Sequence, residues 1–172
     1  CLKAYFASNK IDTTGGWDIY SFDLHESAKP NRVLFLKGEV LYKGEKFIDK
    51  IELDVKNLKT KEVSTIKVNK GSYVSSFTLG DDDDVLITVK KDGFAFNSFY
   101  ISSDDSCFTS PSRLDVQLED LVEGGDFVLD NVYFESDSYH INDIAKEVIF
   151  EFSDYLIINS NLILEINGFT DN

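Results

Sequence analysis

Apolar and polar residues alternate in short runs through the middle of the chain, from about residue 33 to residue 120. The stretches "IELDVKN" and "STIKVNK" repeat with a period of two, as strands with one buried face do. Gly, Asp and Asn separate the runs, and no helical pattern interrupts them. Short strands at about ten-residue spacing are typical of an antiparallel β-sandwich. We therefore predict a seven-stranded sandwich from residues 33–42, 51–57, 62–68, 72–79, 85–90, 96–101 and 114–118.

The pattern changes after the linker "EDLVEGGD". The stretch "FVLDNVYF" is strand-like, and Asn142 or Asp143 can cap a helix. Apolar residues then recur every three or four positions over residues 144–156, which predicts an amphipathic helix. The stretch "LILEI" follows as a second strand. We expect a truncated β-α-β unit with parallel strands, so the predicted fold class is mainly β with a C-terminal α+β part.

The first 32 residues have the pattern of one hairpin. A Gly-Gly turn precedes "WDIYSFDL", and Tyr5, Trp17, Tyr20 and Phe22 form an aromatic stripe. Such a stripe is more often core than a sugar-stacking face, but a lone hairpin has no core of its own. Left uncovered, the stripe would promote self-association. The predicted organisation is a hairpin and linker (1–32), a sandwich (33–120) and a C-terminal unit (127–172).

Acidic residues dominate the charge: 31 Asp and Glu face 17 Lys and Arg, for a net charge of −14. That charge repels phosphate backbones, so we predict no nucleic-acid partner. Methionine is absent, so we expect a processed chain or a fragment of a longer protein. Cys1 and Cys107 are too few for a disulfide framework or a metal cluster. They are either two unrelated thiols or, for Cys1, the lipidated first residue of a lipoprotein.

Motifs for catalysis or metal binding are missing from the sequence. His25 and His140 sit in no H-x-x-H pattern, and there is no G-x-S-x-G elbow. The run "GDDDDV" (80–85) offers carboxylates for calcium, but consecutive acids lack the spacing that turns ligands inward. A solvated hairpin tip is the favoured interpretation. We predict no catalytic residue, no metal, no cofactor and no enzymatic activity.

Three stretches of the chain resemble known families. The segment "NVYFESDSYHINDIAKEVIFEFSDYLIINSNLILEINGFTDN" resembles the first half of the OmpA-like peptidoglycan-binding domain. Members of that family open with an F-x-x-x-S-x-x-I-like strand and, after a helix and a strand, reach G-H-T-D-N. The matching positions here are Phe134, Ser138, Ile141 and then residues 168–172.

Two further resemblances precede this segment. The stretches "FLKGEVLYKGEKFIDKIELDVKNLKTKEV" and "GSYVSSFTLGDDDDVLITVKKDGF" resemble a carboxypeptidase-regulatory-like domain, which is a transthyretin-type sandwich. The stretches "AYFASNK" and "GGWDIYSFDL" resemble the last strands of a TolB-like propeller. The order propeller, sandwich and OmpA-like domain is typical of Bacteroidetes envelope proteins. Under that resemblance Cys1 lies inside a propeller blade.

The OmpA-like resemblance implies binding rather than catalysis. Such domains hold the diaminopimelate of the peptidoglycan stem peptide, with an Asp on its ammonium and a later Arg on its carboxylate. By position the binding residues here are Gly168, Thr170, Asp171 and Asn172, with Phe169 in place of the usual His. The matching Arg is not in this sequence, so we expect weak or no peptidoglycan binding by this chain alone.

These resemblances give a leading hypothesis and an alternative. The leading one is a fragment of a non-catalytic envelope protein of the outer membrane or periplasm. Its intact parent would bind peptidoglycan, with the sandwich as a spacer or interaction module and other envelope proteins as partners. The alternative is a free-standing β-sandwich that binds a protein or a glycan.

Overall fold

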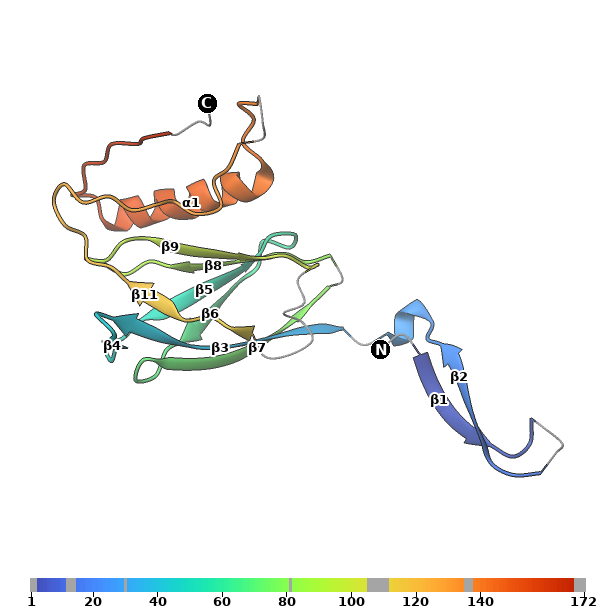
Figure 1. Cartoon of the computed structure of the whole chain (residues 1–172). Helices are drawn as coiled ribbons and strands as arrows, with labels where there is room; N and C mark the ends of the chain where they lie inside the picture. Colours follow the sequence, from blue (N-terminus) through green and yellow to red (C-terminus); the bar gives the residue numbers. More distant parts are fainter. Residues whose placement is uncertain are drawn as a thin grey trace. The chain divides into compact units, whose positions relative to one another are not determined.

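A computed structural model describes residues 3–11, 15–29, 31–80, 82–104, 112–134 and 138–168 (Figure 1). The chain divides into two compact units, Cys1–Arg32 and Val33–Asn172. The described part is mainly β, with several sheets and one α-helix, as the sequence predicts. Among the described residues, no helix combines the length and apolar character that crossing a membrane requires.

The first unit is built on one hairpin. Strands β1 (Lys3–Ser8) and β2 (Asp18–Asp23) pair antiparallel over six residues each. Gly15 has φ +78°, a left-handed conformation that glycine adopts without a Cβ clash. A short 3-10 helix, η1 (Glu26–Ala28), follows β2.

Two sheets face each other in the second unit, so the fold is sandwich-like. One sheet has the order β6-β5-β8-β9 and is antiparallel throughout. The other is arranged around the long strand β3, which pairs with four further strands. In chain order the strands are β3 (Arg32–Tyr42), β4 (Glu45–Lys46), β5 (Glu52–Asn57), β6 (Val63–Lys67), β7 (Ser72–Leu79), β8 (Val85–Val89), β9 (Asn97–Ile101), β10 (Ser112–Arg113) and β11 (Val116–Leu118).

The expectation of a purely antiparallel sandwich is wrong at one place. Strands β10 and β11 both pair parallel with β3, at successive positions along it. The alternation of side chains is the same in parallel and antiparallel strands, so the hydrophobic pattern cannot distinguish them. The pairing of β10 and β11 with β3, a strand some 75 residues earlier, depends on tertiary structure and not on the local sequence.

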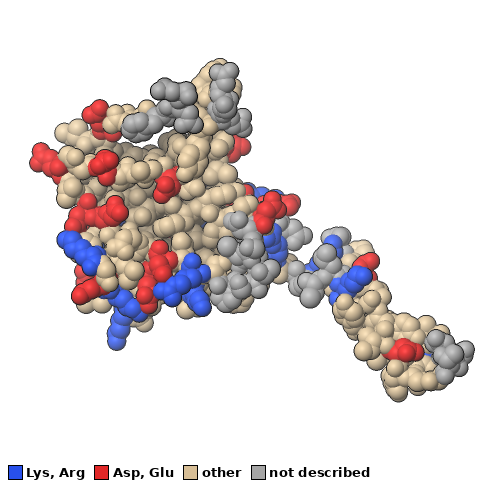
Figure 2. Space-filling model, in the orientation of Figure 1, with Lys and Arg blue, Asp and Glu red and all other residues tan. Residues whose placement is uncertain are grey.

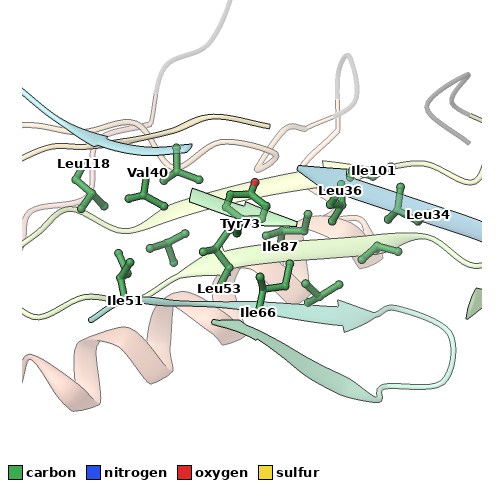
Figure 3. Packing of buried hydrophobic residues seen from close by; sticks show 14 of the residues in the cluster. Leu34, Leu36, Val40, Ile51, Leu53, Ile66, Tyr73, Ile87, Ile101 and Leu118 are labelled. Atoms are coloured by element: carbon green, nitrogen blue, oxygen red, sulfur yellow. The ribbon is translucent and has the colours of Figure 1, made fainter. Parts of the chain in front are cut away.

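The main core lies between the two sheets. In Figure 3, Leu36 and Val40 of β3 lie across from Leu53, Ile66 and Ile87 of the other sheet. Strand β8 departs from simple alternation because all five of its residues are buried. Its odd-numbered residues join the main core, whereas Leu86 joins a second cluster beneath the helix. Burial on both faces explains why "VLITV" is apolar almost throughout.

The helix α1 (Asp143–Ile158) confirms the predicted C-terminal helix. Its N-cap is Asn142, whose Oδ1 accepts a hydrogen bond of 2.7 Å from the Ala145 amide. Figure 1 shows α1 lying along the sheet that contains β8 and β9. Val148 and Tyr155 are fully buried and belong to the cluster that includes Leu86 of β8.

The expected β-α-β unit does not form in the described residues. The stretches 127–134 and 162–168 run without a strand ladder, and only the isolated bridge Phe134–Ile141 occurs there. Phe127, Leu129 and Leu162 instead pack against the cluster beneath α1. These apolar side chains therefore cover the helix–sheet junction as extended chain. The sequence pattern was wrong about their pairing, and other apolar residues of the two stretches, such as Val128 and Ile163, are exposed.

Candidate functional site

The residues predicted to bind peptidoglycan are not brought together by the described structure. Gly168 is the last residue described, and a Cβ added to it would meet nothing within 4 Å. Phe169, Thr170, Asp171 and Asn172 lie outside the described residues, as do Cys1 and Cys107. The described structure therefore gives no binding geometry for this site.

The acidic run at 80–85 has a structural use. Asp83 is buried, and its Oδ2 accepts hydrogen bonds of 2.8 Å from the Asn57 side chain and from the Gly80 amide. Asp84 accepts from the Tyr100 hydroxyl and from the Ser103 amide. These acids tie the turn to its neighbouring strands, so the tip is only partly solvated. No group of three metal-binding side chains occurs in the ranges that the structure describes, which exclude Asp81.

The two histidines have local contacts. The Nδ1 atom of His25 lies 2.9 Å from the Ser27 hydroxyl. His140 lies beside the ring of Tyr139, with 4.8 Å between the ring centroids. Both histidines are solvent-exposed. Their surroundings are those of surface residues.

A group of half-buried charges joins α1 to the sheet, and the sequence did not predict it. Lys56 Nζ lies 2.8 Å from Glu147 and 2.9 Å from Glu151, while Lys90 Nζ lies 2.6 Å from Glu151. Lys61 adds a contact with Glu147 from the loop after β5. The available signal was the i, i+4 pair of glutamates beside the apolar stripe of the helix. We call these five residues the helix clamp.

The close contacts in the helix clamp shift the pKa values of Lys56, Glu147 and Glu151 in the direction that favours the charged forms. Burial disfavours the charged form of Lys56, but its hydrogen bonds to Glu147 and Glu151 outweigh this effect and raise its pKa. Burial likewise opposes ionisation of Glu151, whereas Lys90 and Lys56 hold its pKa below the usual value. Hydrogen bonds from Lys56 and Lys61 lower the pKa of Glu147. Lys56, Glu147 and Glu151 are therefore charged at neutral pH.

Because of the helix clamp, we expect the free energy of unfolding to fall in acid. The pKa values of Glu147 and Glu151 are lower in the folded chain than their ordinary value of 4.5. Their contribution is therefore complete above about pH 5 and is lost as the pH falls through and below 4.5. Lys56 has the opposite sign, since its raised pKa maintains stability until the pH rises beyond 10.5.

Urea unfolding of the wild type and Glu151→Gln at several pH values measures this effect. We expect Glu151→Gln to be less stable by roughly 1.5 kcal/mol at neutral pH. The difference should shrink between about pH 5 and pH 3, because the wild type loses the same charge there. A difference that is independent of pH would show that Glu151 acts through packing alone.

A shallow hollow of about 310 Å³ opens near the end of α1. Three of its lining residues are lysines, but each is already engaged. Lys90 pairs with Glu151, Lys91 donates to the Lys50 carbonyl at 3.2 Å, and Lys50 lies 3.5 Å from Glu52. The hollow holds no nucleophile with an adjacent base. It is the edge of the helix–sheet junction.

The hairpin of the first unit carries the most unusual surface. Phe6, Tyr20 and Phe22 lie on one face, with the Phe6 and Tyr20 rings stacked at 5.5 Å. Tyr5 and Ile19 lie on the opposite face and are 70% and 80% exposed. In Figure 2 most of the visible hairpin surface is neither acidic nor basic. The hairpin therefore has large apolar side chains on both faces, and an isolated two-stranded hairpin is marginally stable at best in water.

Other exposed apolar side chains lie in the second unit. Phe150, Ile157 and Ile158 of α1 are exposed. Ile163 follows in the extended C-terminal stretch and is 98% exposed. They are spread over a helix and a coil. The hairpin instead orders its apolar residues on paired strands, and we treat it as the candidate functional site.

Comparison with known proteins identifies no family for this chain. No protein-family model matches the chain, and no curated protein matches it. A catechol 1,2-dioxygenase from Acinetobacter sp. ADP1, inhibited by bound mercury, is similar to it over 62% of this chain, with 14% identity and a TM-score of 0.41. A 3-chlorocatechol 1,2-dioxygenase from Rhodococcus opacus 1CP is similar over 56%, with 10% identity and a TM-score of 0.40. The chain covers 59% and 62% of those two structures.

These findings contradict the family resemblance drawn from the sequence. The similar structures are catechol dioxygenases, and no OmpA-like, TolB-like or carboxypeptidase-regulatory-like family model matches. The hypothesis of a non-catalytic, peptidoglycan-binding envelope fragment is corrected accordingly, together with its alternative of a free-standing binding sandwich. The prediction of no enzymatic activity is contradicted too, because both similar structures are enzymes. At these TM-scores neither structure brings its activity to this chain.

Proposed function

We propose that the chain takes part in protein assembly through its N-terminal hairpin, which adds to the β structure of another polypeptide. One observation carries this proposal: the hairpin has large apolar side chains on both faces, with Tyr5 and Ile19 on one, beside Lys3, Ser21 and Asp23, and Phe6, Tyr20 and Phe22 on the other. Apolar side chains on both faces are stabilised only when both are covered. A hairpin alone is marginally stable at best in water.

The second unit supplies a stable body for this role. Its core is continuous between the two sheets, and the helix clamp and Tyr155 fix α1 on one of them. Ser98 Oγ is the only buried side-chain polar atom without a hydrogen-bond partner in the described residues. Well-satisfied interiors of this kind are rigid. A location in the outer membrane or periplasm, and the boundaries 33–120 and 127–172, stay predictions.

Matched substitutions test the proposal, with the chain itself as the probe partner. Ile19→Thr removes an exposed apolar side chain from the hairpin, and Ile163→Thr removes one from the second unit. Threonine keeps the β-branch, so strand propensity is retained. In sedimentation velocity we expect the wild type and Ile163→Thr to associate with rising concentration. Ile19→Thr should associate several-fold more weakly.

Equal association of Ile19→Thr and the wild type would refute the hairpin as the assembly surface. Weaker association of Ile163→Thr alone would assign that role to the C-terminal stretch. Circular dichroism of each variant serves as the folding control, because the core of the second unit contains neither residue.

A further inference from the structure

The negative charge of the chain is concentrated in its C-terminal third. Residues 119–172 hold 13 of the 31 acidic residues but only one of the 17 basic residues, so they account for −12 of the net charge of −14. Glu147 and Glu151 of the helix clamp are paired with lysines of the sheet and its loop. Several other acids of this region are exposed and have no ion-pair partner among the described residues. They leave the region strongly negative.

The helix α1 carries two large apolar residues on the side that faces away from the sheet. Phe150 and Ile157 are 62% and 73% exposed. Each follows a fully buried residue, Val148 or Tyr155, by two positions, which is about 200° around a helix. They are seven residues apart, so they share one face about 10 Å apart along the axis. A surface helix normally has polar residues opposite its buried side, so this apolar pair indicates that a further segment covers α1.

Two unpaired acids accompany this apolar pair. Asp154 follows Phe150 by four residues and precedes Ile157 by three, so it is a neighbour of both on the helix surface. In the extended stretch that runs along α1 (Figure 1), Leu129 packs on the cluster beneath the helix and the next residue, Asp130, is exposed. Neither aspartate has an ion-pair partner in the part of the chain that the structure describes. We call Phe150, Asp154, Ile157 and Asp130 the outer surface of α1.

We propose that the outer surface of α1 binds a cationic amphipathic segment of another protein. The apolar residues of that segment cover Phe150 and Ile157, and its Lys or Arg side chains meet Asp154 and Asp130. Lys146, the one basic residue of the region, is already paired with an acid of its own helix. The same acids repel anionic lipid and nucleic acid, which selects a basic polypeptide as the partner. This site is separate from the hairpin and does not depend on the assembly role proposed for it.

Binding of a synthetic peptide to the full chain tests this proposal. The probe is a labelled amphipathic helix of leucine and lysine, about 18 residues long, and its counterpart has glutamate in place of every lysine. Fluorescence anisotropy measures the dissociation constant. Phe150→Ser and Asp154→Asn remove one apolar and one acidic group from the outer surface of α1. The matched controls are Ile48→Ser and Asp49→Asn, both exposed in the loop after β4.

We expect Phe150→Ser to raise the dissociation constant of the lysine peptide at least about fivefold, and Asp154→Asn to raise it about twofold at low salt. The two control variants should bind the peptide like the wild type, and the glutamate peptide should not bind. Ile19→Thr should also leave peptide binding unchanged, so the peptide result stands or falls independently of the hairpin result.

Four results would overturn the inference. They are no binding of the lysine peptide, equal binding of the glutamate peptide, an equal loss in the control variants, and weaker peptide binding by Ile19→Thr, which would place the peptide on the hairpin. The inference also falls if Phe150→Ser leaves peptide binding intact but weakens self-association in sedimentation or binding to phosphatidylcholine vesicles. The occupant of this surface would then be a second copy of the chain or a membrane.

Discussion

Replacing Tyr155 with alanine is expected to lower the free energy of unfolding by about 3–5 kcal/mol. The side chain is fully buried between α1 and the sheet, with its ring 5.7 Å from Phe96 and 5.8 Å from Phe152. Its hydroxyl donates a hydrogen bond of 2.7 Å to the Phe94 carbonyl. Burial raises the pKa of Tyr155 to about 12, so the phenol stays a donor at neutral pH.

The alanine variant would leave a cavity and an unsatisfied carbonyl beneath the helix. For a chain of this length the loss corresponds to a fall in Tm of roughly 6–20 °C. Tyr155→Phe keeps the ring and should cost only about 1–3 kcal/mol. Tyr139→Ala is the matched control, since that tyrosine is 84% exposed. A Tyr155→Ala variant as stable as Tyr139→Ala would show that α1 does not depend on this contact.

Replacing Gly38 with alanine is expected to be the second most damaging change. A Cβ at this position of β3 would lie 1.8 Å from the Leu114 carbonyl oxygen and 3.0 Å from the Tyr73 hydroxyl. That hydroxyl donates to the same carbonyl, so neither group can move without losing the hydrogen bond. Overpacking in an interior costs about 1–3 kcal/mol, and a clash with backbone places Gly38→Ala at or above the upper end.

Thermal unfolding of Gly38→Ala and Gly168→Ala measures this cost. Nothing lies within 4 Å of a Cβ added at Gly168, so that variant should keep the wild-type Tm. Gly38→Ala should unfold at a clearly lower temperature, because β10 and β11 would be displaced from β3. Equal Tm values for the two variants would mean that β3 and the Leu114 backbone do not approach as described.

The sequence predicted those features that depend on local periodicity. Period-two alternation located β5 and β6, and the three- to four-residue spacing located α1. Tertiary contacts decided the rest. The stretch at 127–134 has strand-like composition, yet it forms no ladder, and only Phe127, Leu129 and Val132 pack on the second cluster. The parallel pairing of β10 and β11 depends on a distant strand and leaves no local trace.

For the candidate site too, the sequence indicated the local features and missed those that depend on tertiary contacts. The sequence indicated aromatic residues on the hairpin, but the single stripe predicted from them is wrong, because the register places Tyr5 on the opposite face from Tyr20 and Phe22. The second apolar face became evident only once the register placed Tyr5 and Ile19 together. The helix clamp was missed because Lys56, Lys90 and Glu151 come from three distant segments. Its glutamates resemble ordinary solvent-facing charges until the helix is docked.

The most direct test of the hairpin as an assembly surface uses Trp17, which is the only tryptophan and is 74% exposed next to β2. Its emission spectrum would be recorded for the wild type and Ile19→Thr over the concentration range used for sedimentation. The account predicts that wild-type emission shifts to shorter wavelength as the chain associates, with a weaker shift for Ile19→Thr. Emission of a water-exposed tryptophan at every concentration, while the chain associates, would contradict it.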